Sequence, residues 1–283
     1  MPNRVLLASD LHLCDTDAYG VPTAARMQKF ADDIKKEYER EPFSALLLLG
    51  DYSLDHWNWG YKGSWLERGV SNTALFAEKY LSQIQGLPIE IRMIAGNHEQ
   101  FGEANWERLT GGYKRQDAYV CGDYLFLLLD TYAAKPDPTE HCDCPYRGVP
   151  DTDFIRKTVA AYPDKKVILC AHYLDLNTEA ENDHTDFLNM VASGQFVCAF
   201  AGHTHKSDVW TWEKYGNFKE IFTGNYWQNE STPYEPMWGF REALLFEDRI
   251  ESSYIAPAAT VFRDGKSYHY PYGKRDSISI LTE

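Results

Sequence analysis

The chain has 283 residues, of which 44% are hydrophobic and 25% are charged, a balance typical of a globular protein and not of a disordered or fibrous one. Its formal net charge of −14 disfavours non-specific binding to nucleic acid or to an anionic membrane. No apolar run approaches the roughly 20 residues of a membrane-spanning helix, and the first apolar run is too short for a signal peptide. We therefore expect a cytoplasmic protein without a membrane partner.

Six short apolar runs recur along the first two hundred residues, and such runs suit strands that are buried on both faces. They cover residues 5–8, 45–49, 89–94, 124–129, 166–170 and 197–201. Helix-like stretches lie between several of them, at residues 24–40, 72–85, 151–161 and 186–192. Asp151 is the predicted N-cap of the third. This alternation predicts a layered α/β protein with sheet inside and helices outside.

Beyond residue 205 the pattern changes to short, aromatic, strand-like segments at residues 208–212, 219–223 and 243–246, with no long helical stretch. This strand-rich portion, residues 206–283, predicts a second antiparallel sheet or a strand-rich cap. No internal repeat and no low-complexity linker separates it from the rest of the chain. We therefore expect a single domain over residues 1–283.

Polar residues directly follow the carboxyl ends of five of the six apolar runs. The segments are Ser9-Asp10-Leu11-His12, Gly50-Asp51, Gly96-Asn97-His98-Glu99, Ala171-His172 and Gly202-His203-Thr204-His205. Ligand sites of open α/β sheets gather outside the carboxyl ends of strands, so these side chains are expected to meet in space. Carboxylate, imidazole and amide oxygen are ligands of divalent metals, and seven such groups can fill two coordination spheres.

The order and spacing of these motifs resemble those of the calcineurin-like metallophosphoesterase superfamily over residues 10–205, from Asp-x-His and Gly-Asp through Gly-Asn-His-Glu and a later His to Gly-His-x-His. The resemblance implies a four-layer α/β/β/α sandwich with a binuclear centre at one edge. It also implies two divalent or trivalent metal ions, and Mn, Fe and Zn all accept this set of ligands.

The resemblance further implies a role for each residue. Asp51 would bridge the two ions. The other ligands of one ion would be Asp10, His12 and His205, and those of its neighbour would be Asn97, His172 and His203. His98 would not be a ligand, and would instead hydrogen-bond the phosphoryl oxygen and protonate the leaving group.

These roles imply a hydrolase, in which a hydroxide that bridges the two cations attacks phosphorus in line. We expect a phosphomonoesterase or phosphodiesterase that acts on a small-molecule or nucleotide phosphoester. The alternatives are a protein phosphatase or a nuclease of the same superfamily, or a non-catalytic metal-binding module. The absence of a basic stripe disfavours a nuclease, and the segment after Asp51 lacks the arginine that phosphoprotein phosphatases carry there.

Several residues outside the motifs carry weaker hypotheses. The aromatic stretches at residues 52–65 and 226–240 either wall the pocket and stack on a flat leaving group, or pack on each other or at a dimer interface. Asp55 is a candidate to orient His98. The six cysteines are expected to be reduced and mostly buried. Four further histidines are expected on the surface, namely His56, His141, His184 and His269.

Overall fold

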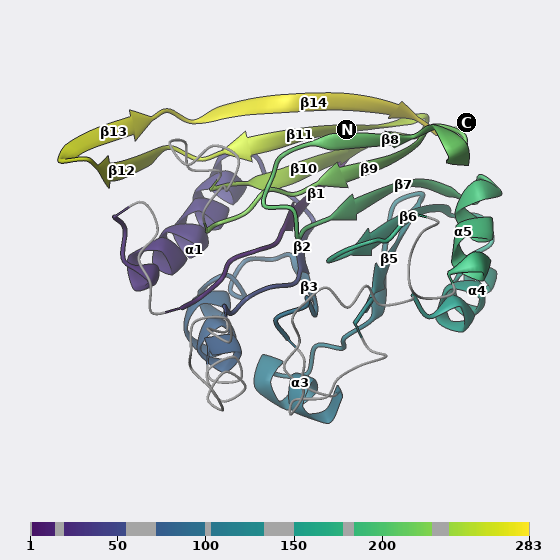
Figure 1. Cartoon of the computed structure of the whole chain (residues 1–283), viewed down its shortest axis with the longest axis horizontal. Coiled ribbons are helices and arrows are strands. Elements are labelled where there is room, and N and C mark those ends of the chain that lie inside the picture. The colour runs from purple at the N-terminus through teal and green to yellow at the C-terminus, as the bar shows by residue number, and fades with distance from the viewer. Residues whose placement is uncertain are drawn as a thin grey trace.

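Two six-stranded β-sheets form the centre of the protein and helices lie outside them, as the computed structural model shows (Figure 1). The structure describes residues 2–14, 20–54, 72–99, 103–132, 150–177, 184–227 and 238–282. Within these ranges no helix is long and apolar enough to cross a membrane.

The first sheet has the strand order β14-β11-β10-β1-β2-β3. Its parallel half consists of β1 (Asn3–Ala8), β2 (Ala45–Leu49) and β3 (Glu90–Ile94). Its antiparallel half consists of β10 (Phe240–Leu245), β11 (Arg249–Ala256) and β14 (Gly273–Leu281). The two halves join where β1 pairs with β10, so the N-terminal strand lies in the middle of the sheet.

The second sheet has the strand order β4-β5-β6-β7-β9-β8. Four parallel strands form its centre, namely β5 (Tyr124–Leu129), β6 (Lys166–Ala171), β7 (Phe196–Ala201) and β9 (Phe218–Phe222). Antiparallel strands form its edges, β4 (Asp117–Cys121) and β8 (Val209–Trp212). A separate hairpin joins β12 (Ala259–Arg263) to β13 (Lys266–Tyr270) and projects from the body (Figure 1).

Helices cover the outer faces of both sheets. They are α1 (Thr23–Arg40), α3 (Glu103–Thr110), α4 (Thr152–Ala161) and α5 (Thr185–Ala192). Short turns of other helix types span Phe76–Tyr80, Leu81–Gln83 and Glu213–Tyr215. The first residues of α4 confirm the predicted cap, because the Asp151 carboxylate accepts hydrogen bonds from the amides of Asp153 at 3.1 Å and Phe154 at 3.0 Å.

Alternate side chains of each central strand enter different cores, which explains why the strands are apolar throughout. On β1, Leu6 packs in the core beneath α1, whereas Val5 and Leu7 pack between the two sheets. On β5, Phe126 also packs between the sheets, whereas Leu127 faces the core beneath α4 and α5. The layers therefore run α/β/β/α, which confirms the expected four-layer sandwich.

The C-terminal portion is rich in strands as predicted, but the prediction of a second antiparallel sheet formed by that portion is wrong. Strands β10, β11 and β14 extend the first sheet, while β8 and β9 extend the second. The reason is that their apolar side chains complete cores that the N-terminal strands begin. For example, Ala243 and Ile250 pack between the sheets with Val5.

The predictions for individual cysteines and histidines have different outcomes. The described cysteines form no disulfide and are buried, as expected, and they are Cys14, Cys121, Cys170 and Cys198. His269 is exposed, as expected. His184 is buried, 3% exposed, so the prediction of a surface position is wrong; it directly precedes α5, whose Phe187 anchors the helix in the core. His56 and His141 lie outside the described residues.

Glu220 on β9 is a buried carboxylate whose protonation should affect stability. Its side chain accepts a hydrogen bond from Trp212 Nε1 at 2.9 Å, and burial raises its pKa to about 8. Because folding raises the pKa of this carboxyl group, its contribution to the free energy of unfolding is fully present below its unfolded pKa, near 4.5. That contribution is lost as the pH rises through 8.

We expect Glu220→Gln to stabilise the protein increasingly between pH 5 and pH 8, by up to about 4 kcal/mol above pH 8, because glutamine keeps the acceptor without the buried charge. Urea denaturation of both proteins at pH 5.5 and pH 8.5 measures this difference. Equal differences in unfolding free energy at the two pH values would show that Glu220 does not carry the effect.

Candidate metal centre

The five polar motifs meet at one edge of the sandwich, where the carboxyl ends of the parallel strands of both sheets lie together. Strands β1, β2 and β3 of the first sheet lead into Asp10, Asp51 and Asn97. Strands β6 and β7 of the second sheet lead into His172 and His203. This arrangement brings together residues that are up to about 200 positions apart in the sequence, as their types and positions predicted.

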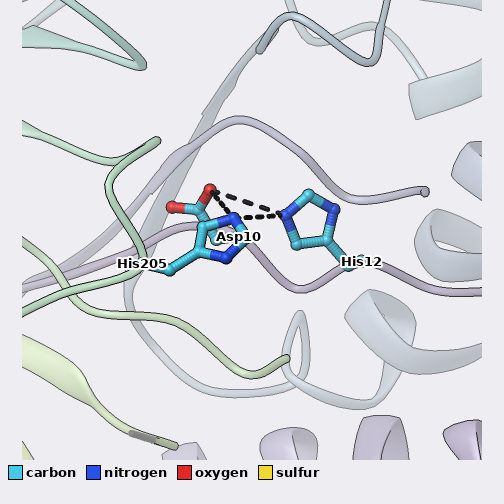
Figure 2. Close-up of side chains that lie close together, drawn as sticks. All are labelled: Asp10, His12 and His205. Atoms are coloured by element: carbon cyan, nitrogen blue, oxygen red, sulfur yellow. Dashed lines mark hydrogen bonds and ion pairs between the residues drawn. The ribbon is translucent and has the colours of Figure 1, made fainter. Parts of the chain in front are cut away.

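Asp10, His12 and His205 form the first group of candidate ligands (Figure 2). His12 Nε2 lies 2.9 Å from His205 Nε2. Asp10 Oδ1 lies 3.3 Å from His205 Nε2 and 3.6 Å from His12 Nε2. Three ligand atoms therefore point at one another from two loops, which is the arrangement that a cation between them would hold.

Asp51, Asn97, His172 and His203 form the second group. His172 Nε2 lies 3.0 Å from Asp51 Oδ2 and 3.0 Å from Asn97 Oδ1, while His203 Nδ1 lies 2.9 Å from the same Asn97 oxygen. Asp51 Oδ2 is also 3.8 Å from His12 Nε2 of the first group. Asp51 therefore lies between the two groups, where a bridging ligand belongs.

One buried oxygen tests whether these residues fit a cation. Asp10 Oδ1 has no hydrogen-bond donor among the described residues, although Nε2 atoms of His12, His172 and His205 lie within 4.0 Å of it. An ionised oxygen without a donor is costly in a protein interior. The donor set of carboxylate, imidazole and amide oxygen suits a divalent metal, so the residues fit the implied ions.

The ionisation of the side chains agrees with this fit. Burial alone raises the pKa of Asp10 and of Asp51, but the surrounding histidines, His172 foremost, together outweigh it and hold both pKa values below their usual range. Burial lowers the pKa of His12 and of His203 to about 4, so both imidazoles are neutral at pH 7. Ionised carboxylates and neutral imidazoles are the forms that bind metals.

The backbone is strained at the same positions. Five candidate ligands have left-handed φ angles, namely Asp10 at 54°, His12 at 47°, Asp51 at 59°, His203 at 68° and His205 at 54°. A residue other than glycine adopts such a conformation at a cost of roughly 1–3 kcal/mol, and only where surrounding contacts impose it. Strain of this kind clusters at functional sites, which adds an independent reason to place the site here.

His98 lies at the accessible side of the cluster. Its side chain is 13% exposed, its backbone amide donates to Asp51 Oδ1 at 3.1 Å, and its Nε2 lies 3.8 Å from Asp51 Oδ2. With His12 and Asp51 it forms a third possible group of ligand atoms. His98 therefore belongs to the candidate metal centre. Its predicted role above the ions is a hypothesis that a His98 variant can test.

Glu99 is a supporting residue whose role the motif did not reveal. Its buried carboxylate accepts hydrogen bonds from the amides of Asp51 at 2.8 Å, Gly96 at 2.8 Å and Tyr52 at 2.9 Å. Burial and the nearby Asp51 raise its pKa to about 7. Glu99 thereby ties together the two loops that follow β2 and β3. Gly96 is required in this contact, because a Cβ atom there would collide with Asp51 Oδ1.

The end of β5 also carries an acid, Asp130, which sequence reasoning passed over. Arg115 forms an ion pair with Asp130, and its Nη1 donates to the carbonyl of Glu99 at 2.8 Å. The signal was the same as for the other motifs, an acid directly after an apolar run. Here Arg115 pairs with the carboxylate of Asp130, so Asp130 supports the loop that contains Glu99 and does not join the cluster of candidate ligands.

The aromatic stretches are partly described, and the described residues pack in the core. Tyr52 is fully buried and donates its hydroxyl to the carbonyls of Leu48 at 2.9 Å and Ile94 at 2.7 Å. Tyr226, Trp227 and Trp238 belong to the core beneath α1. These residues favour the packing interpretation over stacking on a substrate. Asp55 and residues 56–65 and 228–237 lie outside the described residues.

Comparisons with known proteins agree with this geometry. Residues 3–207 match the model of the calcineurin-like phosphoesterase family. A search by sequence finds no match among curated proteins.

Two solved structures with TM-scores above 0.5 show the same fold at low identity, and a third is similar at a lower TM-score. GAP50, the anchor in the inner membrane complex of Plasmodium, has a TM-score of 0.53 at 12% identity, covering 97% of this chain and 90% of its own. The purple acid phosphatase PPD1 from yellow lupin (Lupinus luteus) seeds has a TM-score of 0.52 at 13% identity, over 99% of this chain and 54% of its own. Vacuolar protein sorting 29 from Cryptosporidium parvum has a TM-score of 0.44 at 11% identity, over 99% of both chains.

Proposed function

The chain belongs to the calcineurin-like phosphoesterase family, and from this premise we propose that it is a binuclear, metal-dependent hydrolase of small-molecule or nucleotide phosphoesters. The observation that carries the proposal is the convergence of seven candidate ligands from five strand ends, with three of their imidazoles within 4.0 Å of the donorless oxygen of Asp10. A phosphate-binding site on a chain with a net charge of −14 needs cations to attract its substrate, and this cluster is suited to bind them.

The side chains divide between the two ions as follows. Asp10, His12 and His205 would hold one ion, and Asn97, His172 and His203 would hold the other, with Asp51 between them. Bound divalent ions of this kind, Mn, Fe or Zn, lower the pKa of a bound water and stabilise charge on phosphoryl oxygens. Burial lowers the pKa of His172, but the carboxylates of Asp51 and Asp10 outweigh this effect and raise the pKa to about 9. The ring would therefore have to release a proton to act as a metal ligand.

His98 would act on the substrate directly. Its amide is fixed by Asp51 Oδ1, and its partly exposed ring packs edge-on against His12 with ring centroids 5.2 Å apart. A ring held in this way can donate a hydrogen bond to a phosphoryl oxygen and pass a proton to the departing alkoxide. Because Asp51 both accepts the His98 amide and lies between the ligand groups, it would hold the proton donor in place relative to the ions.

Hydrolysis of two model substrates tests the proposal. The purified protein, loaded with Mn²⁺, is assayed on para-nitrophenyl phosphate and on bis(para-nitrophenyl) phosphate, with metal-free protein as the control. We expect metal-dependent release of para-nitrophenol from at least one ester, and the preferred ester separates a monoesterase from a diesterase. Protein that binds ions but hydrolyses neither these esters nor a panel of nucleotides would contradict the proposal and favour a non-catalytic module.

A further inference from the structure

The segment after β9 lies directly against the loop of the first ligand group. Tyr226 donates its backbone amide to the carbonyl of Asp10 at 3.0 Å. Asn225 Nδ2 donates to the carbonyl of His205 at 2.7 Å, and its Oδ1 accepts the amide of Trp227 at 2.8 Å. Residues 225–227 therefore contact the backbone of two candidate ligands, both of which belong to the first group.

Arg26 of α1 joins this segment to the same loop from below. Its guanidinium is fully buried; Nη1 donates to the carbonyls of Leu11 and Tyr226, and Nη2 donates to the carbonyl of His12 at 2.7 Å. The guanidinium also lies over the Trp227 ring, 5.0 Å from its centroid. Burial lowers the pKa of Arg26 to about 10, and the side chain remains charged at neutral pH.

These hydrogen bonds fix the conformation of His12. The carbonyls of Leu11 and His12 stand on either side of the His12 Cα atom, so holding both restricts φ and ψ of this residue. His12 has a left-handed φ of 47°, a conformation that persists only when neighbouring contacts impose it. Its amide is also held, donating to the carbonyl of Asp51 at 3.0 Å.

We infer that Arg26 and Asn225 are positioning residues that hold His12 and His205 for the first metal ion and leave the second ion unaffected. This inference rests on the metal centre of the proposed function. The side chains of the second group are oriented by other residues, because His172 Nδ1 donates to the carbonyl of Leu49 at 2.8 Å and Asn97 Oδ1 bonds the rings of His172 and His203. The described hydrogen bonds of Arg26 and Asn225 reach none of these residues.

Titration of metal-free protein with Mn²⁺, with free Mn²⁺ followed by electron paramagnetic resonance, tests the inference. We expect Arg26→Met to weaken one of two binding events by about 10–100-fold, the range typical of residues that orient metal ligands, and to leave the other unchanged. Arg26→Lys should weaken the same event less, because an ammonium group keeps the charge but cannot hold three carbonyls in one plane.

Two backgrounds identify which ion is affected. In Asn97→Ala protein, which keeps the whole first group, Arg26→Met should still weaken binding. In His205→Ala protein, which lacks a ligand of the first ion, Arg26→Met should have no further effect. Asn225→Ala leaves the buried charge in place and should weaken the same event as Arg26→Met, so the inference stays testable if Arg26→Met does not fold.

Arg241→Met is the matched control. Arg241 is also fully buried, burial lowers its pKa to about 10, and it donates to the carbonyls of Phe222 at 2.9 Å and Asp276 at 2.7 Å. This variant should lose stability but keep both binding events. Equal weakening by Arg241→Met, unchanged binding by Arg26→Met and Asn225→Ala, or a wild-type protein that binds no ion would each overturn the inference.

The titration reads ion binding without turnover, so the two proposals can fail separately. A wild-type protein that binds two ions and hydrolyses no phosphoester would contradict the proposed function, and a selective effect of Arg26→Met would still support the positioning role. Conversely, an active wild-type protein whose Arg26 variants bind both ions normally would contradict the positioning role and leave the proposed function supported.

Discussion

Replacing Asp51 with alanine is expected to remove both metal ions and to reduce phosphoester hydrolysis to the level of metal-free protein. The reason is that Asp51 Oδ2 lies 3.0 Å from His172 Nε2 and 3.8 Å from His12 Nε2, so a single carboxylate serves both groups. Its loss removes negative charge from both positions and leaves each ion with incomplete coordination. Metal analysis by mass spectrometry, together with the rate on the preferred model ester, measures the two effects.

Asp123→Ala provides the control for this variant, because Asp123 is an exposed aspartate in the turn between β4 and β5. It should bind both ions and keep full activity. Retention of both ions in the Asp51→Ala protein would show that the bridging position is wrongly assigned. Loss of one ion alone would place Asp51 in a single coordination sphere and contradict the bridging role.

Replacing His98 with alanine is expected to leave both ions in place and to slow turnover by about 10²–10⁴-fold, the range typical of a lost general acid. The effect should fall on kcat more than on metal content, because His98 contributes a proton donor and not a required ligand. It should also depend on the leaving group. A phosphoester of an alkyl alcohol should lose more rate than one of para-nitrophenol, which departs without help from a proton.

The same experiment separates the two positions that geometry allows His98. Loss of an ion in His98→Ala protein would make His98 a ligand, as its distance of 3.8 Å from Asp51 Oδ2 permits. Full activity on both classes of ester would remove it from the mechanism. His269→Ala, a change at an exposed histidine of the projecting hairpin, is the control and should alter neither metal content nor rate.

The central strands and the convergence of the candidate ligands were predictable because each signal is local to one strand or to the end of one strand. Strands buried on both faces have to be apolar along their whole length, and residues 45–49 and 124–129 were delimited correctly for this reason. The cluster followed from the rule that sites gather at the carboxyl ends of such strands. The N-cap at Asp151 was likewise a local signal, since its carboxylate bonds amides two and three residues ahead.

Elements whose causes are distant in sequence were not predictable. Helix α3 and strand β4 were missed, and the helix expected over residues 72–85 passes into π and 3₁₀ turns from residue 76 onward. The roles of the supporting residues also depend on contacts between residues that are far apart in the sequence. Arg26 carries no motif, and its role arises only because the fold brings it to Tyr226, 200 positions away. Glu99 shows its role only once β2 and β3 lie side by side.

The anomalous scattering of a crystal grown with Mn²⁺ would test the account most directly. Two manganese peaks should stand on either side of the Asp51 carboxylate, one among Asp10, His12 and His205 and the other among Asn97, His172 and His203. A map in which these side chains bind no manganese, or in which manganese lies only elsewhere on the protein, would contradict the binuclear centre on which the proposed hydrolysis depends.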